Sequence, residues 1–404
     1  MVDQVDVSGS PGEGVEALPL ACNPARLTDS AFTRRRRGAL KSLLLSGVFA
    51  GLSSAAFAGG APELPTGGVF VAGSGVISSP SASALQVRQA TARGVIDWRS
   101  FSIGQGGQVT ILNGQGATLN RVTGGQMSIL RGGLSATGSV FLVNPQGVVV
   151  GPEGRILAGG AIGLSSRDIA NSAFMAGGNL TARGDSVGDV TNLGRILSRR
   201  GDVFLIGASV LNGGEIAAPN GLVGLAAGET VLMAPAEGAR GLYVSSGASG
   251  AGDVTVSGRI EAASVALASA GGSVYTLAGN RGGAIQATGV RSAGGEVWLS
   301  APEGEVRVDG AIQARKGPDG GLITVSGRAV AVGSAAVLDA SGQSGGTVLV
   351  GVTAPQTGLS ESTSIASGAR ILAGGPAGGG MIETSGRLMT IGDAIIRAGE
   401  GGHG

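Results

Sequence analysis

The chain has 404 residues and a formal net charge of +1, and 79 of its residues are glycine. This glycine content is far above the usual ~7%, so an ordinary compact globule does not fit. The glycines lack an every-third-residue register and 42% of the residues are hydrophobic, so neither a collagen helix nor a disordered chain fits. With two lysines, Lys41 and Lys316, and 3% aromatic residues, the chain offers neither a basic stripe nor stacking platforms, and we expect no nucleic-acid partner.

The first 58 residues have the features of a secretion signal. Arg34 to Arg37 and Lys41 precede an apolar run from Leu43 to Phe57, and the Ala56-Phe57-Ala58 triplet has the form that signal peptidase accepts. We predict cleavage after Ala58 and assign residues 1–58 to a signal region with an extended amino-terminal part. The run is too short and too interrupted for a retained membrane span.

Two motifs follow in the block from Gly94 to Ile162. They are Asn120-Arg121-Val122-Thr123-Gly124 and Asn144-Pro145-Gln146-Gly147, separated by Ser128-Ile129 and by the run from Gly138 to Val143. In order and spacing, the block resembles the amino-terminal secretion domain of filamentous haemagglutinin-like exoproteins, the passengers of two-partner secretion in Gram-negative bacteria. In that family these positions mark turns, and the Asn-Pro element is associated with secretion.

Physical chemistry also predicts a tight turn at the second motif. Asn144 can bond the backbone two residues on, Pro145 fixes φ, and Gly147 suits the left-handed corner. The sequence departs from the family's commonest wording at Gln146, usually asparagine, and at Thr137, where asparagine often precedes the glycine. Two interpretations of the nine motif residues stay open here: structural turns alone, or determinants of secretion.

A loose repeat extends beyond these motifs. Period-2 segments about five residues long, such as Asp253–Val256 and Thr347–Val350, alternate with glycine turns and predict short strands. A Gly-x-Ile pattern recurs at Gly194, Gly214, Gly258, Gly283 and Gly310, at intervals of 20, 44, 25 and 27 residues. Counting the second interval as two coils, we infer a solenoid of 20 to 27 residues per coil and about 15 coils.

The predicted fold is therefore all-β, a single right-handed parallel β-helix with an amino-terminal capping region. By the resemblance, residues 59–300 form the two-partner secretion domain and residues 301–404 begin a β-helix stalk. The stalk ends abruptly, which leaves two interpretations open: a short member of the family or a truncated reading frame. The lone Cys22 precedes the cleavage site, so the mature chain has no thiol, which suits passage across the periplasm unfolded. For the same reason we prefer the general secretory route to twin-arginine export, which carries folded proteins.

The resemblance implies a partner and a use. The partner is a two-partner outer-membrane transporter with periplasmic recognition domains, and the product is a secreted or cell-surface adhesin or haemagglutinin that binds a host-cell or glycan receptor. Other classes remain open: the delivery stalk of a contact-dependent toxin, a polysaccharide-active β-helix enzyme, or a non-functional truncated product.

Several motifs that suggest other chemistry lack the residues that the chemistry requires. Gly342–Gly346 has nucleophile-elbow spacing and Gly114-Gln115-Gly116 resembles a phosphate loop, yet no helix is predicted after either one and the only histidine is His403. The same shortage argues against a zinc site. We expect no catalytic residue, cofactor or metal. The tripeptides Arg183-Gly184-Asp185 and Arg200-Gly201-Asp202 are interpreted as solenoid corners rather than receptor-binding motifs.

Overall fold

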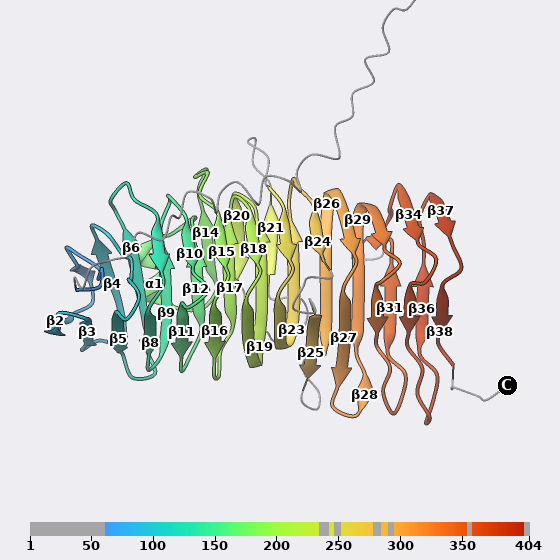
Figure 1. The fold of residues 1–404 in the computed structure, drawn as a ribbon, viewed down its shortest axis with the longest axis horizontal. Helices are drawn as coiled ribbons and strands as arrows, with labels where there is room; N and C mark the ends of the chain where they lie inside the picture. The colour runs from blue at the N-terminus through green and yellow to red at the C-terminus, as the bar shows by residue number, and fades with distance from the viewer. Residues whose placement is uncertain are drawn as a thin grey trace, which may run out of the picture. The chain divides into compact units, whose positions relative to one another are not determined.

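The computed structural model describes residues 61–233, 242–245, 252–277, 284–289, 295–353 and 358–399. The predicted signal region and its cleavage site, together with Cys22 and His403, lie outside these described residues. The described part is a parallel β-helix, as predicted, in which successive coils follow one another from β2 to β38 (Figure 1). No helix in the described part is long and apolar enough to cross a bilayer.

Each complete coil contributes a strand to each of three faces. The first, which we call the isoleucine face, carries the Gly-x-Ile repeats and the shorter strands that stack with them. Its strands are β3 (Ala84–Gln89), β5 (Gln108–Leu112), β8 (Gly133–Ala136), β11 (Arg155–Ala158), β16 (Arg195–Ser198), the first part of β19 (Glu215–Ala227), the first part of β23 (Arg259–Ser269), β25 (Ala284–Gly289), β27 (Ala311–Lys316), β30 (Val337–Asp339), β35 (Arg370–Leu372) and β38 (Ile395–Arg397).

The second face carries the first motif and is covered by an outer layer; we call it the covered face. Its strands are β4 (Arg93–Trp98), β6 (Ala117–Val122), β9 (Ser139–Val143), β12 (Ile162–Ser165), β17 (Val203–Gly207), the later parts of β19 and β23, the first parts of β26 (Glu296–Val308) and β29 (Leu322–Val332), β31 (Thr347–Val350) and β36 (Met381–Thr384).

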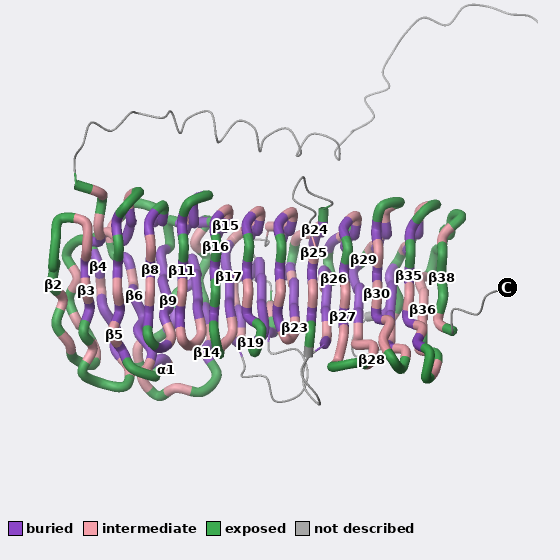
Figure 2. The backbone as a smooth tube through the Cα atoms, turned by 60° about the horizontal axis from the view of Figure 1, so that its bottom comes forward, coloured by how far each residue is buried: buried purple, intermediate pink, exposed green. Residues whose placement is uncertain are grey.

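The third face is built from short strands that follow the second motif. Its strands are β7 (Ser128–Leu130), β10 (Val148–Val150), β15 (Val190–Asn192), β18 (Val210–Asn212), β22 (Val254–Val256), β24 (Val274–Thr276), the later parts of β26 and β29, β34 (Ser362–Ile365) and β37 (Leu388–Ile391). Buried strand interiors alternate with exposed corners along most coils (Figure 2), whereas β37 and β38 are exposed along their whole length.

One continuous ladder of aliphatic side chains runs inside the isoleucine face. Parallel pairing places each residue directly on its equivalent in the next coil, as Ile196 on Ile216 and Ile216 on Ile260. The twelve rungs are Leu85, Val109, Leu134, Ile156, Ile196, Ile216, Ile260, Ile285, Ile312, Leu338, Ile371 and Ile396. All are buried except Ile396 of the last strand, which is 38% exposed. Each buried aliphatic side chain contributes on the order of 2 kcal/mol of transfer free energy. Because each rung is buried by the coils on either side of it, a coil gains this stability from its neighbours and need not be stable alone.

The ladder corrects two details of the sequence reading. The 44-residue interval is one coil and not two, because Ile216 pairs directly with Ile260 and the extra residues include an outer hairpin formed by β20 (Thr230–Met233) and β21 (Leu242–Ser245). The estimate of about 15 coils was likewise too high, since inserted segments use residues that would otherwise form coils.

Two such insertions build an outer layer on the covered face. The antiparallel sheet contains β13 (Asp168–Ile169) and β14 (Leu180–Arg183) from one insertion and β20 and β21 from the other. The helix α1 (Asn171–Ala176) lies against β4 and buries Phe174. This layer and the outward side chains of the covered face form a second hydrophobic core, separate from the core inside the solenoid.

Antiparallel strands close the amino end of the solenoid. At the amino end, β1 (Val69–Ala72) runs antiparallel to β4, and β2 (Gly75–Ser81) runs antiparallel to β3. These reversed strands form the predicted amino-terminal capping region, because they use hydrogen-bonding groups that a parallel coil would leave open. Two short elements lie farther along: β28 (Asp319–Gly320) pairs with β27, and β32 (Val352–Thr353) pairs with β33 (Gly358–Leu359).

Candidate secretion-motif site

Asn120 joins three consecutive coils from inside the solenoid. It lies in β6 with no exposed surface. The Trp98 indole Nε1–H donates to Asn120 Oδ1 at 3.0 Å, and Asn120 Nδ2 donates to the Phe141 carbonyl oxygen at 3.1 Å. Trp98 belongs to β4 and Phe141 to β9, so one amide satisfies polar groups of the coils on both sides. A buried amide of this kind is costly to remove, because each abandoned partner loses its hydrogen bond.

Arg121 projects from the opposite side of the same strand and fastens the outer layer. Its Nε donates to Asp168 Oδ1 at 2.8 Å, its Nη2 donates to the Ile169 carbonyl oxygen at 2.8 Å, and its Nη1 donates to Asp97 Oδ1 at 3.3 Å. Asp168 and Ile169 form β13 of the outer sheet, whereas Asp97 lies in β4. One guanidinium therefore ties two coils of the solenoid to the layer that covers them.

The remaining residues of the first motif end the strand. Val122 is buried in the solenoid core, and both the amide nitrogen and Oγ1 of Thr123 donate to the Trp98 carbonyl oxygen, at 2.8 and 3.0 Å. At Gly124 a Cβ atom would lie 2.1 Å from the Arg99 carbonyl oxygen, so only glycine fits. The expectation that the whole motif forms a turn is wrong for Asn120, Arg121 and Val122, whose alternating sides serve two separate cores.

The second motif forms the turn that its sequence predicts. Gln146 N donates to Asn144 Oδ1 at 2.9 Å, and Gly147 N donates to the Asn144 carbonyl oxygen at 2.9 Å, which closes the turn around Pro145. Gly147 has φ of 103°, and a Cβ atom there would lie 2.8 Å from the Asp189 carbonyl oxygen of the next coil. Pro145 and Gln146 are exposed, whereas Asn144 is fully buried.

The two motifs belong to one hydrogen-bonded unit. Strands β6 and β9 pair in parallel with Arg121 opposite Val143, so the motifs end neighbouring strands of the covered face. Asn144 Nδ2 then donates to the Gln126 carbonyl oxygen at 2.9 Å and to Ser128 Oγ at 3.0 Å, which fixes the loop that follows the first motif. Both asparagines act on the backbone and side chains of neighbouring coils rather than on solvent.

The departure at Thr137 keeps a hydrogen-bonded corner. Thr137 Oγ1 donates to Asn113 Oδ1 at 3.1 Å and accepts from Asn113 N at 2.9 Å, and Gly138 N also donates to Asn113 Oδ1, at 2.7 Å. An asparagine from the preceding coil thus satisfies groups at this corner. Turn formation survives the substitution, as the sequence suggested.

Sequence reasoning missed two partners of the motifs. Trp98 lies in the same recognised block, but only the strand register reveals that its indole faces Asn120. Asp168 lies 47 residues after Arg121 in a two-residue strand, and nothing in local spacing connects the two. Antiparallel outer strands of this length leave no periodic signal that a sequence could show.

A buried arginine, Arg167, was also missed. Its Nε donates to the Gly228 carbonyl oxygen at 2.7 Å, and its Nη1 donates to both the carbonyl oxygen and Oγ of Ser186. Burial lowers the pKa of Arg167, and the carboxylates of Glu229, Asp185 and Asp189 oppose that shift. The residue joins segments from both insertions that build the outer layer.

The two Arg-Gly-Asp tripeptides lie in different surroundings. Residues 200–202 form a corner between β16 and β17, as predicted, where Asp202 Oδ1 accepts from Leu222 N at 2.8 Å and burial raises the pKa of Asp202. Residues 183–185 end β14 of the outer sheet, so the expectation of a solenoid corner is wrong for this copy. The Asp202 carboxylate is engaged within the fold, which argues against a receptor role for that copy.

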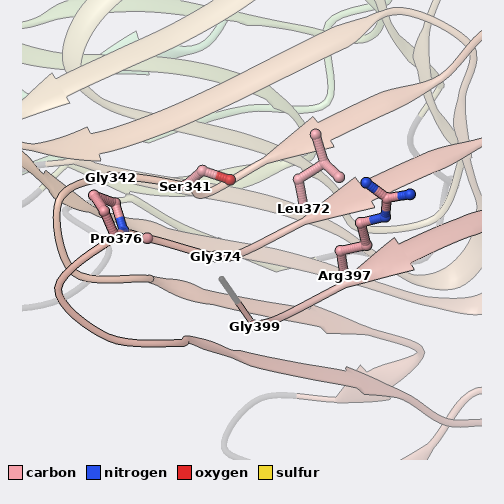
Figure 3. A pocket seen from close by; sticks show the side chains of 8 residues that line it. Ser341, Gly342, Leu372, Gly374, Pro376, Arg397 and Gly399 are labelled. Atoms are coloured by element: carbon pink, nitrogen blue, oxygen red, sulfur yellow. The ribbon is translucent and has the colours of Figure 1, made fainter. Parts of the chain in front are cut away.

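The other sequence motifs lie in turns between strands. Ser344 precedes β31, and Gly114-Gln115-Gly116 precedes β6, so each is followed by a strand where the nucleophile elbow or phosphate loop requires a helix. A 540 Å³ hollow near the carboxy-terminal coils is lined by glycine-rich corners with Ser341, Leu372, Pro376 and Arg397 (Figure 3). Arg397 is the one charged side chain of this lining. Among the described residues, no group of three or more His, Cys, Asp or Glu side chains is arranged to hold a metal ion.

Residues 64–350 match the model of the TPS secretion domain family, which covers well over half of the chain. The chain belongs to the two-partner secretion family. It is 27% identical to the HMW1 secretion domain of Haemophilus influenzae, with a TM-score of 0.67 over 83% of this chain and 98% of that domain. This two-partner secretion exoprotein is therefore exported through a dedicated outer-membrane transporter and is secreted or held at the cell surface.

Two curated relatives share part of the sequence. Both are heme/hemopexin-binding proteins of Haemophilus influenzae, 32% identical over 197 residues and 37% identical over 100 residues. The alignments cover 46% and 24% of this chain, but only 21% and 11% of the relatives. The chain thus spans about a fifth or less of their length. Neither these relatives nor the secretion domain is named as an enzyme.

Proposed function

We propose that residues 59 to about 300 of this exoprotein carry recognition by the periplasmic domains of its outer-membrane transporter, and that the exported protein is an adhesin or haemagglutinin. The observation that carries the targeting proposal is the shared unit formed by the two motifs. Asn120 and Asn144 bond neighbouring coils at 2.9 to 3.1 Å. Their replacement would disturb the family's signature region as a whole rather than one contact.

The same unit is a candidate folding nucleus for the emerging chain. Parallel coils add one at a time, and each new coil gains ladder hydrogen bonds and buries one rung of the aliphatic ladder. The unit joins β4, β6 and β9 near the amino end, so it would be complete when only a few coils have crossed the membrane. Folding outside then opposes backward sliding without a nucleotide energy source.

Secretion assays with paired variants test this proposal. Replacing Asn120 and Asn144 by alanine is expected to abolish release into the medium while periplasmic protein persists. Asn220→Ala is the matched control, because Asn220 is exposed and makes one bond, to the Arg199 carbonyl oxygen at 3.0 Å. Unchanged release of the double variant would overturn the targeting proposal.

A further variant distinguishes direct recognition from nucleation. Gln146 is exposed in the second motif, and Gln146→Ala leaves the Asn144 bonds in place because Gln146 contributes only its backbone nitrogen. If the transporter binds the Gln146 side chain directly, release of the variant into the medium falls while the unfolding midpoint of the purified protein is unchanged. Normal release of Gln146→Ala, together with loss in the asparagine variants, supports nucleation.

We propose that residues 301–404 begin a β-helix stalk, which is supported by the continuation of the parallel coils through β29, β31 and β36. Strand β26 runs through residue 300, so the proposed boundary separates functions and not folding units.

Cell-adherence and haemagglutination assays with the purified exoprotein test the proposed adhesin or haemagglutinin function. Absence of adherence by a correctly folded, secreted protein would contradict it.

A second candidate function is binding of haem or hemopexin, favoured by the names of the two relatives. The described residues contain no histidine or cysteine, which are common axial ligands of haem iron. A surface contact with hemopexin is therefore the form of this function that we propose. Co-precipitation with haem-loaded hemopexin tests it, and haemin alone distinguishes a direct haem site by its absorbance.

A further inference from the structure

A groove with four unpaired arginines crosses the isoleucine face. Two adjoining hollows of 610 and 380 Å³ share Ser135 of β8 and Leu157 of β11 in their linings, so they form one depression across these neighbouring strands. Arg131 and Arg155 line the first hollow, and Arg199 and Arg200 line the second. We call this depression the arginine groove.

The arginines of the groove are available to a ligand. All four are exposed, and none forms an ion pair with any residue that the structure describes. Arg200 donates from Nε to the Gly159 carbonyl oxygen at 3.3 Å, and the guanidinium groups of the other three have no polar partner among the described residues. Elsewhere on this face Arg195 and Arg259 are paired, with Glu215 and Glu261, whereas Arg370 has no ion pair among the described residues. The groove therefore differs from the rest of the face in holding four such arginines together.

The groove carries an excess of positive charge, although the chain as a whole is nearly neutral. The whole chain carries a formal charge of +1, yet this lining holds four guanidinium groups and one carboxylate, Glu153. Glu153 Oε2 already accepts a hydrogen bond from Gln105 Nε2 at 2.6 Å. Four guanidinium groups beside a single carboxylate are most simply explained by an anionic ligand, to which the planar guanidinium donates in pairs.

The floor of the groove fits an extended chain better than a compact ligand. The small residues Gly132, Gly133, Ser135 and Gly159 line the depression, and Gln108 adds a side-chain amide. Gln105 and Thr137 also line it, but their side chains already bond Glu153 and Asn113. A four-residue strand is about 13 Å long and successive coils are ~4.8 Å apart, so the groove spans the length of several sugar units. No aromatic ring lines it, which disfavours stacked bases.

We propose that the arginine groove binds a short stretch of an anionic polysaccharide through its sulfate or carboxylate groups. This inference rests on the proposed adhesin function and names its receptor class. The arginines act as charge and hydrogen-bond donors, and the small residues allow the chain to approach the backbone of β8 and β11. Binding is non-covalent and weakens as salt concentration rises.

Binding of the full exoprotein to a size-defined heparin oligosaccharide tests the proposal. The variant Arg155→Gln/Arg199→Gln removes one unpaired guanidinium from each hollow, and we expect affinity to fall about tenfold or more with a shallower salt dependence. Arg370→Gln is the matched control, because Arg370 is exposed on the same face outside both hollows. The control should change affinity less than about twofold.

Three results would overturn the proposal: no heparin binding at moderate ionic strength, equal loss in Arg370→Gln, or equally tight groove-dependent binding of a single-stranded oligonucleotide. A hyaluronan oligosaccharide, which carries carboxylates alone, distinguishes carboxylate from sulfate recognition, and a neutral dextran should not bind. Unchanged far-UV circular dichroism checks that the variants fold. If heparin binds in the groove but the protein does not adhere to cells, the adhesin proposal fails while the groove stands.

Discussion

The coils before residue 300 and those after it share one inner ladder but differ in their outer layer. On the covered face, an outward register runs through Leu119, Phe141, Gly163, Phe204, Gly224, Ala266 and Trp298, and then through Thr324, Leu349 and Glu383. The second hydrophobic core includes members of this register up to Trp298 and none beyond it. Inner stacking therefore continues through all the coils, whereas the second hydrophobic core covers only the coils before residue 300.

The early coils also contain a large-and-small alternation that the later coils lack. A Cβ atom on Gly163 would lie 2.3 Å from the Phe141 ring, and one on Gly224 would lie 2.9 Å from the Phe204 ring. Each aromatic ring covers the glycine of the next coil, so the glycines here are required by close packing. Phe141 also meets Phe174 of α1 edge to face, with centroids 5.5 Å apart.

Removing an aromatic ring of the early coils should produce the largest effect. Phe204→Ala is expected to lower the free energy of unfolding by about 4 kcal/mol, because it opens a cavity between the solenoid and the outer sheet. Leu349→Ala, at the same register but outside the second core, should cost about 2 kcal/mol, the lower end of the range for leucine. Urea denaturation followed by circular dichroism measures both values. Equal losses would break the distinction between the two regions.

The buried asparagine of the first motif should rank next. Asn120→Ala leaves the Trp98 indole and the Phe141 carbonyl without partners, and we expect a loss of about 3 kcal/mol. Asn220→Ala, which removes a single exposed bond, should cost less than about 0.5 kcal/mol. The same denaturation experiment applies to both. If Asn120→Ala were as mild as its control, the motif would have no structural role in the early coils.

A local rather than global change is expected at Arg121. Arg121→Ala removes two bonds between the solenoid and β13 and a third to Asp97 of the neighbouring coil, at a cost of about 2 kcal/mol because the contacts are only partly buried. Limited proteolysis should then cleave near residues 168–183 before it cleaves the coils, whereas Arg195→Ala, which loses a single exposed ion pair with Glu215, should not expose this segment. Cleavage within the coils first would show that the outer layer is not a separable unit.

The contrast also explains which features could be predicted from the sequence. The Gly-x-Ile repeat predicted the inner ladder because parallel stacking repeats the same residue type once per coil, at intervals of 20 to 27 residues where no hairpin is inserted. The Asn144 turn was predictable because every interaction that defines it lies within four residues. Local signals therefore sufficed for the coils and their corners.

The outer layer was not predictable by the same reasoning. Its strands come from two insertions and pair antiparallel, with β14 against β20, some 50 residues later in the chain. The Gly214 to Gly258 interval therefore looked like two coils. Arg121 and Asp168 meet only because the first insertion folds back over β6, and neither residue has a neighbour in sequence that indicates this.

The smallest predicted effect concerns a carboxylate at a corner of the early coils. Burial raises the pKa of Asp202 above its ordinary value of 3.8, partly offset by the hydrogen bond from Leu222 N. The folded state therefore holds the proton more tightly than the unfolded state, so stability falls as pH rises from about 3.8 through the raised pKa. At pH 7 the folded protein bears the full cost of a charged, partly buried carboxylate.

Asp202→Asn removes this cost while its amide oxygen can still accept from Leu222 N. We expect the unfolding midpoint to rise by about 2 °C at pH 7, and the difference from the parent protein to disappear below about pH 4. Asp253→Asn is the control, because Asp253 accepts an equivalent bond from Ser273 N at 2.8 Å, and any change that both variants share is due to the amide itself. A difference that grows as pH falls would contradict the sign of the pKa shift. It would then follow that the Asp202 carboxylate stabilises its corner as an ion.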